Sequence, residues 1–468
     1  MIVGRITRWL DDRLGATSWA RTALNKVFPD HWSFMLGEIA MYCFAILVLT
    51  GIYLTFFYVP SSRIITYTGE YVPLVGARVS EAYASVVDLS FSVRAGLVFR
   101  QTHHWAANVF VAAVVVHLAR IFFTGAFRRP REINWIIGVT LLIMAMFNGF
   151  TGYSLPDDLL SGTGLRIAYS IALSVPLIGT WLAFLIFGGE FPAHDIIPRL
   201  FIMHVLLVPA VITGLLSIHL ALVWHQKHTQ FPTRGRTETN VVGSKLWPTY
   251  AIKSIGLFLA IAAVLGFLGG LAQINPVWLY GPFDPATVTS AAQPDWYLGW
   301  VEGALRIFPP WEVEAFGHTI PNPFFPGVLL PGITFVVLYL WPFIEQRFTG
   351  DREPHNLLDR PRDRPIRTAI GAGAFTFYAL LFMAASNDIA ARMFDVSVLV
   401  ITWVFRVAVV VLPPLVGLVV YRLMRGLALS GAERFTEVPL SAFLRGRPTP
   451  DGERSSTAAA TSHRTETS

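Results

Sequence analysis

Eight apolar runs divide the chain, and each is long enough to cross a bilayer as a helix, which takes about 20 predominantly apolar residues. Polar and charged loops separate the runs. The pattern therefore predicts an all-α integral membrane protein with eight transmembrane helices. The predicted spans are residues 34–58, 98–124, 134–154, 200–224, 249–271, 326–345, 369–387 and 398–424.

Composition supports this prediction and narrows the chemistry. The 468 residues are 54% hydrophobic and 14% charged, whereas soluble domains carry about 25% charged residues. The only cysteine, Cys43, lies in an apolar run. The chain therefore forms no internal disulfide, lacks the C-x-x-C-H motif of covalent haem and has no cysteine cluster for iron and sulfur.

Lys and Arg alternate between successive loops. They are frequent before the first span and in the loops after the second, fourth and sixth, whereas residues 273–325 contain only Arg306. Cytoplasmic loops of membrane proteins are enriched in these residues. We therefore expect a plasma-membrane protein with both termini cytoplasmic and loops 155–199 and 273–325 outside. The net charge of +6 then reflects topology, not nucleic-acid binding.

The predicted spans and loops suggest four parts. A cytoplasmic N-terminal segment precedes a four-helix bundle, a C-terminal membrane domain follows, and a tail with few large apolar residues is expected to be disordered. The expected boundaries are 1–33, 34–224, 225–425 and 426–468.

Four histidines are spaced by nearly whole helical turns in two of the spans. His103 and His117 are 14 residues apart in the second span, and His204 and His219 are 15 apart in the fourth. Each pair then lies on one helix face, about 21–23 Å apart along the axis. Two crossings separate these spans, so they run parallel. His103 should face His204 near the outer surface, and His117 should face His219 near the inner one.

Imidazole is a common axial ligand of haem iron, so the two facing pairs predict two stacked, non-covalent b-type haems. Glycines with the same 14-residue period would let the first and third helices approach the flat rings. The topology assigns Gly37 and Gly138 to the inner haem and Gly51 and Gly152 to the outer one. Three arginines flank the histidines and could pair with haem propionates. These are Arg100, Arg120 and Arg199.

Single features of this set have simpler explanations. A lone intramembrane histidine is often a helix–helix hydrogen-bonding residue, and glycines recur in membrane helices for packing. The four histidines and four glycines together favour the di-haem interpretation. His104 points about 100° away from His103, and the residue 14 positions later is Leu118, so His104 is expected to pack or line a pocket.

Three further motifs carry a family resemblance. They are R-x-x-N-W-x-x-G at 131–138, GYSLPDDLLSGTG at 152–164, and PDWY at 294–297 followed by Arg306. With the histidines, they make the chain resemble the cytochrome b subunits of quinol:cytochrome c oxidoreductases, the cytochrome bc complexes, from about residue 30 to 425. The resemblance implies quinol oxidation outside, electron transfer through two haems to quinone inside, and coupled proton translocation.

The resemblance places the outer quinol site around the second and third motifs. Asp295 would be the base that accepts a quinol proton, although a helix N-cap is an alternative role for it. The slot would be shaped by Tyr153, Gly164, Pro294 and Tyr297. Mitochondrial forms carry Glu where this chain has Asp295 and Tyr at the position of Glu302. Glu302 could assist the proton path or simply be a capped, solvated residue.

The inner quinone site is less defined, because mitochondrial forms carry a His at Trp224 and an Asp at Ser254. Candidates by location are Trp32, His225, Glu238 and Lys253, although such residues at a membrane boundary are usually anchors.

The chain looks most similar to actinobacterial and related Gram-positive forms in the 15-residue spacing, the PDWY motif, HQKHTQFP after the fourth span and the polar tail. This likeness implies menaquinol as substrate, a Rieske iron–sulfur subunit, a c-type cytochrome subunit, a terminal oxidase and a dimeric complex in membrane lipid. Three alternatives stay open: a di-haem anchor linking a dehydrogenase to quinone, a proton-coupled transporter, and a degenerate structural subunit.

Overall fold

The computed structural model describes residues 2–287, 293–315 and 317–436. These residues contain eight helices long and apolar enough to cross a membrane. Each overlaps one predicted span, so the all-α, eight-span fold is confirmed. The spans are Trp32–Thr55, Gly96–Thr124, Glu132–Tyr153, Ile196–Gln226, Leu246–Leu271, Phe325–Thr349, Pro365–Ala384 and Val398–Leu429.

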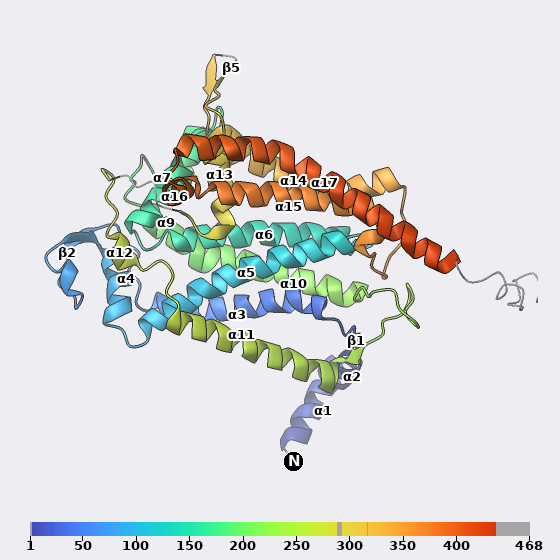
Figure 1. Cartoon of the computed structure of the whole chain (residues 1–468). Coiled ribbons are helices and arrows are strands. Elements are labelled where there is room, and N and C mark those ends of the chain that lie inside the picture. The colour runs from blue at the N-terminus through green and yellow to red at the C-terminus, as the bar shows by residue number, and fades with distance from the viewer. Residues whose placement is uncertain (1, 288–292, 316, 437–468) are drawn as a thin grey trace, which may run out of the picture.

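Four spans form a central bundle (Figure 1). Helix α3 (Met35–Thr55) packs on α5 (Gly96–Thr124), which contacts α6 (Glu132–Tyr153), and α6 in turn packs on α10 (Val208–Gln226). Small residues allow this close approach, as at Ala106, which is fully buried in the bundle core.

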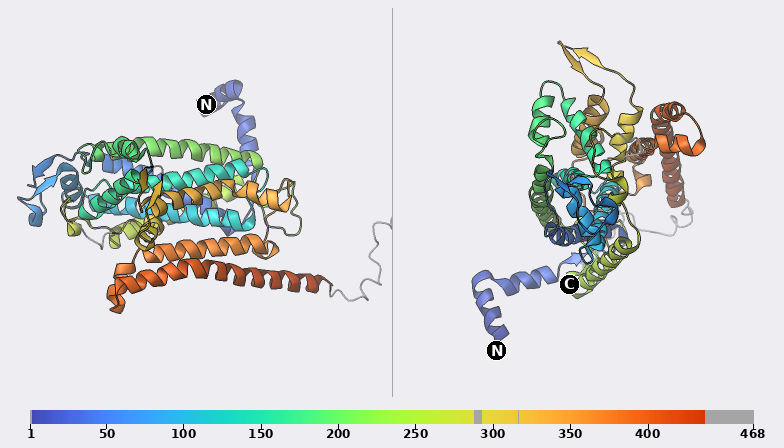
Figure 2. Two further views of the ribbon diagram at one scale, coloured as in Figure 1. Left: turned by 90° about the horizontal axis from the view of Figure 1, so that it is seen from above. Right: turned by 90° about the vertical axis from the view of Figure 1, so that its left-hand side faces the viewer.

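A fifth helix, α11 (Ala251–Leu271), covers α3 and α5, and the remaining spans form a flanking layer (Figure 2). In that layer α15 (Pro365–Ala384) packs along α17 (Val398–Thr436). Helix α17 continues to Thr436, so the first part of the segment expected to be a disordered tail is helical. The rest of that segment, 437–468, lies outside the described residues.

The shorter elements gather at the two ends of the bundle. One end carries the loop helices and the β2–β3 pairing, the other carries α1, α2 and the β1–β4 pairing, and the β5–β6 hairpin projects from the body (Figure 1). The helices are α1 (Ile2–Leu14), α2 (Ala16–Leu24), α4 (Glu81–Phe91), α7 (Leu159–Leu173), α8 (Gly179–Phe187), α9 (Ile196–Ile202), α12 (Val277–Tyr280), α13 (Gly299–Ile307) and α16 (Asn387–Phe394). Helix α14 (Leu330–Thr349) belongs instead to the sixth span. The strands are β1 (Val27–Phe28), β2 (Ile64–Thr66), β3 (Arg78–Ser80), β4 (Ser244–Lys245), β5 (Val313–Ala315) and β6 (His318–Ile320).

Three spans contain a π-helical turn in their first part, at Met203–Leu207, Leu246–Tyr250 and Phe325–Leu329. A π-helical turn bonds each residue to the fifth along and so takes up one residue more than an α-helical turn. The first of the three joins α9 to α10 and contains His204.

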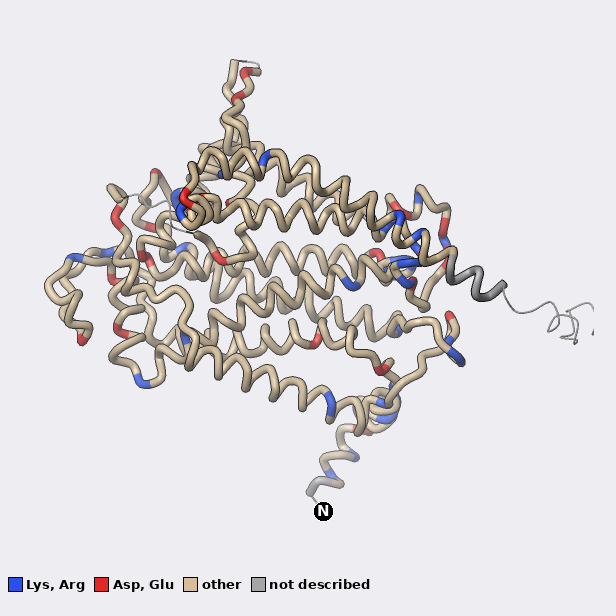
Figure 3. The backbone as a smooth tube through the Cα atoms, viewed as in Figure 1, with Lys and Arg blue, Asp and Glu red and all other residues tan. Residues whose placement is uncertain are grey.

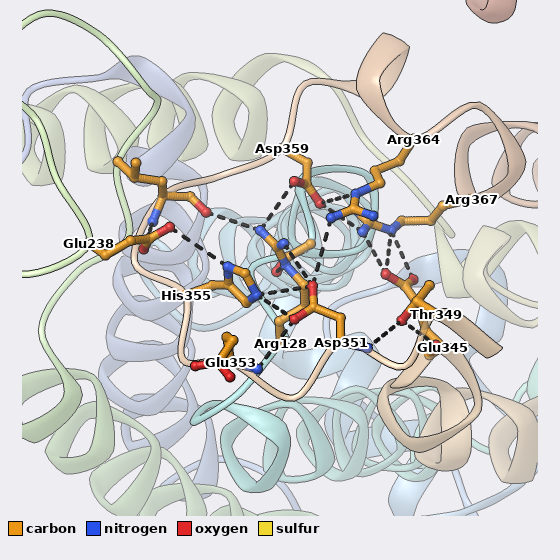
Figure 4. Close-up of polar contacts among 12 residues, drawn as sticks. Arg128, Glu238, Glu345, Thr349, Asp351, Glu353, His355, Asp359, Arg364 and Arg367 are labelled. Carbon is orange, nitrogen blue, oxygen red and sulfur yellow. Dashed lines mark hydrogen bonds and ion pairs between the residues drawn. The ribbon is translucent and has the colours of Figure 1, made fainter. Parts of the chain in front are cut away.

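Charged residues collect at the two ends of the bundle and leave long uncharged stretches between them (Figure 3). The end with the Lys- and Arg-rich loops contains an ion-pair network (Figure 4). Its most buried member, Arg367, lies 2.6 Å from Glu345 and 2.8 Å from Asp359. Asp359 also pairs with Arg128 at 3.3 Å. Because one unpaired member would leave a buried charge, the network fixes the loop after α5 against the segment between α14 and α15.

Candidate functional site

The outer histidines face each other across the bundle. The ring centroids of His103, on α5, and His204, in the π-helical turn, are 6.1 Å apart, and the ring planes are inclined by 70°. A metal–imidazole bond is about 2 Å long. The lengths of two such bonds, added to the distance from each bonding nitrogen to its ring centre, come close to the centroid separation of 6.1 Å. The geometry therefore suits one metal ion between the rings.

Hydrogen bonds set the tautomer of both outer rings. His204 Nδ1 donates to the Asn148 carbonyl at 2.9 Å. The Thr50 hydroxyl donates its own proton to the Ile46 carbonyl at 2.7 Å, so it accepts from His103 Nδ1 at 2.9 Å. An imidazole that donates through Nδ1 keeps a lone pair on Nε2, the form that binds a metal.

The inner histidines line a common cavity. His117 on α5 and His219 on α10 share it with Gly37, Gly138 and Arg120. Among the described residues, the buried Nδ1 of His117 has no hydrogen-bond partner, and that of His219 makes none of ordinary geometry, with the Asn134 backbone as its neighbour. The shared cavity between the two rings leaves room for a bound group.

Each of the four predicted glycines lies against one of the four histidines. A Cβ atom at Gly51 would be 3.3 Å from His103 Cε1, and one at Gly37 would be 3.3 Å from His117 Cε1. A Cβ at Gly152 would be only 2.4 Å from His204 Cε1. At Gly138 the distance to His219 Cε1 would be 3.8 Å. The structure thus places Gly37 and Gly138 at one level of the bundle and Gly51 and Gly152 at the other.

Two of the three predicted arginines enter these cavities. Arg100 lines the outer cavity and Arg120 the inner one, and in both the buried Nε and Nη2 atoms have no partner among the described residues. A buried guanidinium is costly without an anion, so both suit a ligand that carries carboxylates. Arg199 does not fit: it is exposed, lines neither cavity and donates to the Leu185 carbonyl at 2.8 Å. Its side chain turns toward the C-terminal end of α8, where helix carbonyls attract a cation.

Asp295 points into the outer cavity, not along the helix that follows it. Its side chain makes no capping hydrogen bond, so the N-cap role is wrong. Instead its carboxylate lies 2.9 Å from His104 Nε2 and accepts from the Tyr297 hydroxyl at 3.1 Å. Burial, followed by the Asp295 charge, raises the pKa of Tyr297 well above its usual value. Tyr297 therefore stays a hydrogen-bond donor to this carboxylate.

A second, largely apolar cavity adjoins the outer one. Tyr153 lines both, and Gly164, Pro294 and Glu302 line only the second. Glu302 is buried, at 8% exposure, and accepts from Arg306 Nε at 2.7 Å. Its interpretation as a solvated residue is therefore wrong. Three of the four residues predicted to shape the slot, Tyr153, Gly164 and Pro294, are thus brought together beside Glu302. The fourth, Tyr297, lines the outer cavity with Asp295.

The inner candidates chosen by location lie elsewhere. Trp32 and His225 are exposed, and Lys253 forms an ion pair with Asp30 at 2.8 Å. The Glu238 carboxylate accepts from the Leu357 amide at 2.8 Å. None of the four candidates lines the inner cavity.

The rim of that cavity has other polar residues, which sequence reasoning missed. They are Glu38, Lys227, His228 and Tyr250. Glu38 carries a usable signal, because an acidic residue within an apolar span is rarely without a role.

Comparisons with known proteins agree with this geometry. Residues 108–282 match the family described as cytochrome b(N-terminal)/b6/petB. Proteins named cytochrome bc1 complex cytochrome b subunit are similar along most of the chain. The one from Mycobacterium bovis is 56% identical over 427 residues, covering 91% of this chain and 78% of its own. That from Corynebacterium diphtheriae is 52% identical over 424 residues, with 91% and 78% covered.

A third relative, from Streptomyces coelicolor, is 49% identical over 423 residues, which cover 90% of this chain and 78% of its own. The fold is similar to a chain of the solved structure "Hyperthermophilic respiratory Complex III". The TM-score is 0.64 at 20% identity, with 88% of this chain and 99% of that chain covered.

Proposed function

Because this chain belongs to the cytochrome b subunits of the cytochrome bc1 complex, which oxidise quinol and pass electrons through b haems, we propose that its four histidines hold two non-covalent b haems. His103 and His204 would ligate the outer haem iron, and His117 and His219 the inner one. The observation that carries this proposal is the facing outer pair, with centroids 6.1 Å apart and both Nδ1 atoms hydrogen-bonded. When bound, such a haem supplies a one-electron carrier.

The other cavity residues have supporting roles in this proposal. The glycines of α3 and α6 leave the helix surfaces flat where a porphyrin would lie. Arg100 and Arg120 would pair with the propionates, because their free guanidinium nitrogens are buried in the two cavities. Charge-assisted hydrogen bonds of this kind are stronger than neutral ones.

Quinol oxidation at the outer site releases two protons and two electrons. We assign Asp295 as the proton acceptor, since a carboxylate beside an apolar slot can serve as a general base. His104 and Tyr297 hold that carboxylate in place. Tyr153, Gly164, Pro294 and Glu302 form the walls that receive the quinol ring. One electron would leave to an iron–sulfur partner and the other would enter this subunit.

The complete proposal is a quinone cycle across the plasma membrane. Quinone is reduced at the inner end with uptake of protons inside, while protons leave outside. We propose menaquinol as the substrate, a Rieske iron–sulfur subunit and a c-type cytochrome subunit as partners, a terminal oxidase beyond them, and a dimeric complex. Relatives named as subunits of a bc1 complex support assembly with partner subunits. The identities of the quinol and of the partners rest on the likeness of the sequence motifs to actinobacterial forms. The loop charges support cytoplasmic termini.

The test is a reduced-minus-oxidised optical spectrum of the purified complex, in wild type and in His117→Ala. We expect two b-type signals in wild type and one or none in the variant. His318→Ala, at an exposed position on β6, is the matched control and should keep both. A wild-type protein without b-type haem contradicts the proposal and favours the transporter. Haem without a co-purifying iron–sulfur subunit favours the di-haem anchor.

A further inference from the structure

A carboxylate at the inner end of the bundle is surrounded by hydroxyl donors. Glu38 follows Gly37, the glycine that lies against His117. Its carboxylate accepts from the hydroxyls of Tyr250, of Ser254 at 2.7 Å and of Tyr42 at 3.4 Å. Three donors from two helices fix the direction of this side chain. Glu38 and Tyr250 both line the cavity that contains the inner histidines.

An imidazole stands on the same rim. His228 lines the cavity, and its buried Nδ1 has no partner among the described residues. Phe28 packs behind the rim without lining the cavity, and its ring centroid is 4.6 Å from that of His228 and 4.5 Å from that of Tyr250. The rim therefore offers two separate hydrogen-bonding points that pack against one buried aromatic ring. A quinone ring, with a carbonyl oxygen at each end, has the matching shape.

Burial, helped by nearby positive charges, keeps His228 neutral. Burial, together with Lys26, Arg131 and Arg120, lowers its pKa to about 4. A neutral imidazole has one N–H to donate and adds no further positive charge to a rim that already contains Lys227. Lys227 is exposed, so the cavity meets the inner aqueous phase there.

We propose that Glu38, acting through Tyr250, is the proton donor for quinone reduction at the inner end, and that His228 positions the opposite quinone oxygen. This inference rests on the proposed function, which delivers the two electrons. Glu38 first takes a proton from inner water, and its carboxyl then passes that proton to the Tyr250 oxygen as Tyr250 gives its own proton to one quinone oxygen. The second oxygen, held by His228, takes its proton from inner water. Two electrons and two protons thus convert the quinone to quinol with two new O–H bonds.

Glu38→Gln separates this role from a structural one. The amide keeps the size of the side chain and can still accept from Tyr250, but it has no acidic proton to give. In the purified complex, quinol should reduce the b haems at the wild-type rate, and their re-oxidation by added menaquinone should slow about 100-fold, the usual contribution of a general acid. Glu38→Asp should recover part of the rate. Glu353→Gln, an exposed change at the same end of the molecule, is the matched control and should re-oxidise normally.

Three outcomes decide the matter. Slow re-oxidation with both b-type signals and normal outer reduction supports Glu38 as donor. Wild-type re-oxidation in Glu38→Gln overturns the inference and leaves the proposed function standing. If Glu38→Gln does not assemble, Ser254→Ala replaces it: a hydroxyl that orients the donor should slow re-oxidation severalfold, and an unchanged rate overturns the inference.

Discussion

At the outer level of the bundle both histidines have their Nδ1 atoms hydrogen-bonded, whereas among the described residues of the inner level the Nδ1 of His117 has no partner and that of His219 has only the Asn134 backbone nearby. The helix sequences also differ between the two levels. Each outer glycine follows a threonine, Thr50 before Gly51 and Thr151 before Gly152, and both threonine hydroxyls lie within hydrogen-bond distance of a histidine. The inner glycines follow Leu36 and Ile137. The outer rings thus have threonine hydroxyls beside them, and the inner rings do not, within the part of the chain that the structure describes.

The largest effect is expected when one glycine at each level is replaced by alanine, which adds a single methyl group beside the histidine. Gly152→Ala places a Cβ 2.4 Å from His204 Cε1, a distance that atoms cannot adopt, whereas Gly138→Ala places it at 3.8 Å from His219, an ordinary contact. We expect Gly152→Ala to lose the outer b-type signal and quinol oxidation altogether. Gly138→Ala should keep both signals, as measured by optical spectra of the two purified variants. Equal spectra would show that the rings adjust freely at both levels.

Each level also has its own carboxylate, Asp295 outside and Glu38 inside. Asp295→Asn should slow quinol oxidation about 10²–10⁴-fold, because the amide cannot accept the quinol proton. Re-oxidation of the b haems by quinone should be unchanged. Stopped-flow absorbance of b-haem reduction measures the first step and a quinone pulse the second. If both steps slow together, the two ends do not work as separate sites.

The orientation of the outer rings can be weakened without removing a ligand. Thr50→Val keeps the shape of the side chain but removes the acceptor for His103 Nδ1. Partners of metal-bound histidines typically contribute 10–100-fold in affinity or activity. We expect haem loss from the outer level at about this ratio on titration with a haem-binding competitor. The inner signal is the internal control, and an equal loss at both levels would contradict the contrast.

The smallest effect concerns stability and pH at the outer end. Burial, together with the Asp158 charge, raises the pKa of Asp157 to about 6, above the unfolded value of about 4. The folded protein favours the neutral form of Asp157. The contribution of this group to the free energy of unfolding is therefore complete below about pH 4 and is lost as the pH rises through about 6. Asp157→Asn, with a residue that tolerates the positive φ of 53°, should raise the melting temperature of the complex at pH 7.5. The substitution should have little effect on the melting temperature at pH 4.5. An equal shift in melting temperature at the two pH values would contradict the raised pKa of Asp157.

Periodic features were predictable from the sequence, and features set by loop conformation were not. The eight spans and the facing of His103 with His204 follow from hydrophobic length and helical phase, which are local properties. The contact between His104 and Asp295 joins residues 191 positions apart, and no local pattern encodes it. Arg199 was misplaced for the same reason, since the fold of the loop before α9 decides where its side chain points. Glu38 went unrecognised because its donors Tyr250 and Ser254 come from a helix far along the chain.

The π-helical turn at Met203–Leu207 has a consequence for the distance between redox centres. In a regular α-helix, 14 residues return to within about 40° of the starting direction, and 15 overshoot it by about 60°. The π-helical turn takes up the additional residue between His204 and His219, so the fourth span presents its two histidines in the same phase as the second. The two helices thus separate their histidines by a similar distance along the axis, although the number of residues between them differs by one. Since electron transfer depends steeply on separation, a one-residue insertion can enter this span without changing the step between the two levels.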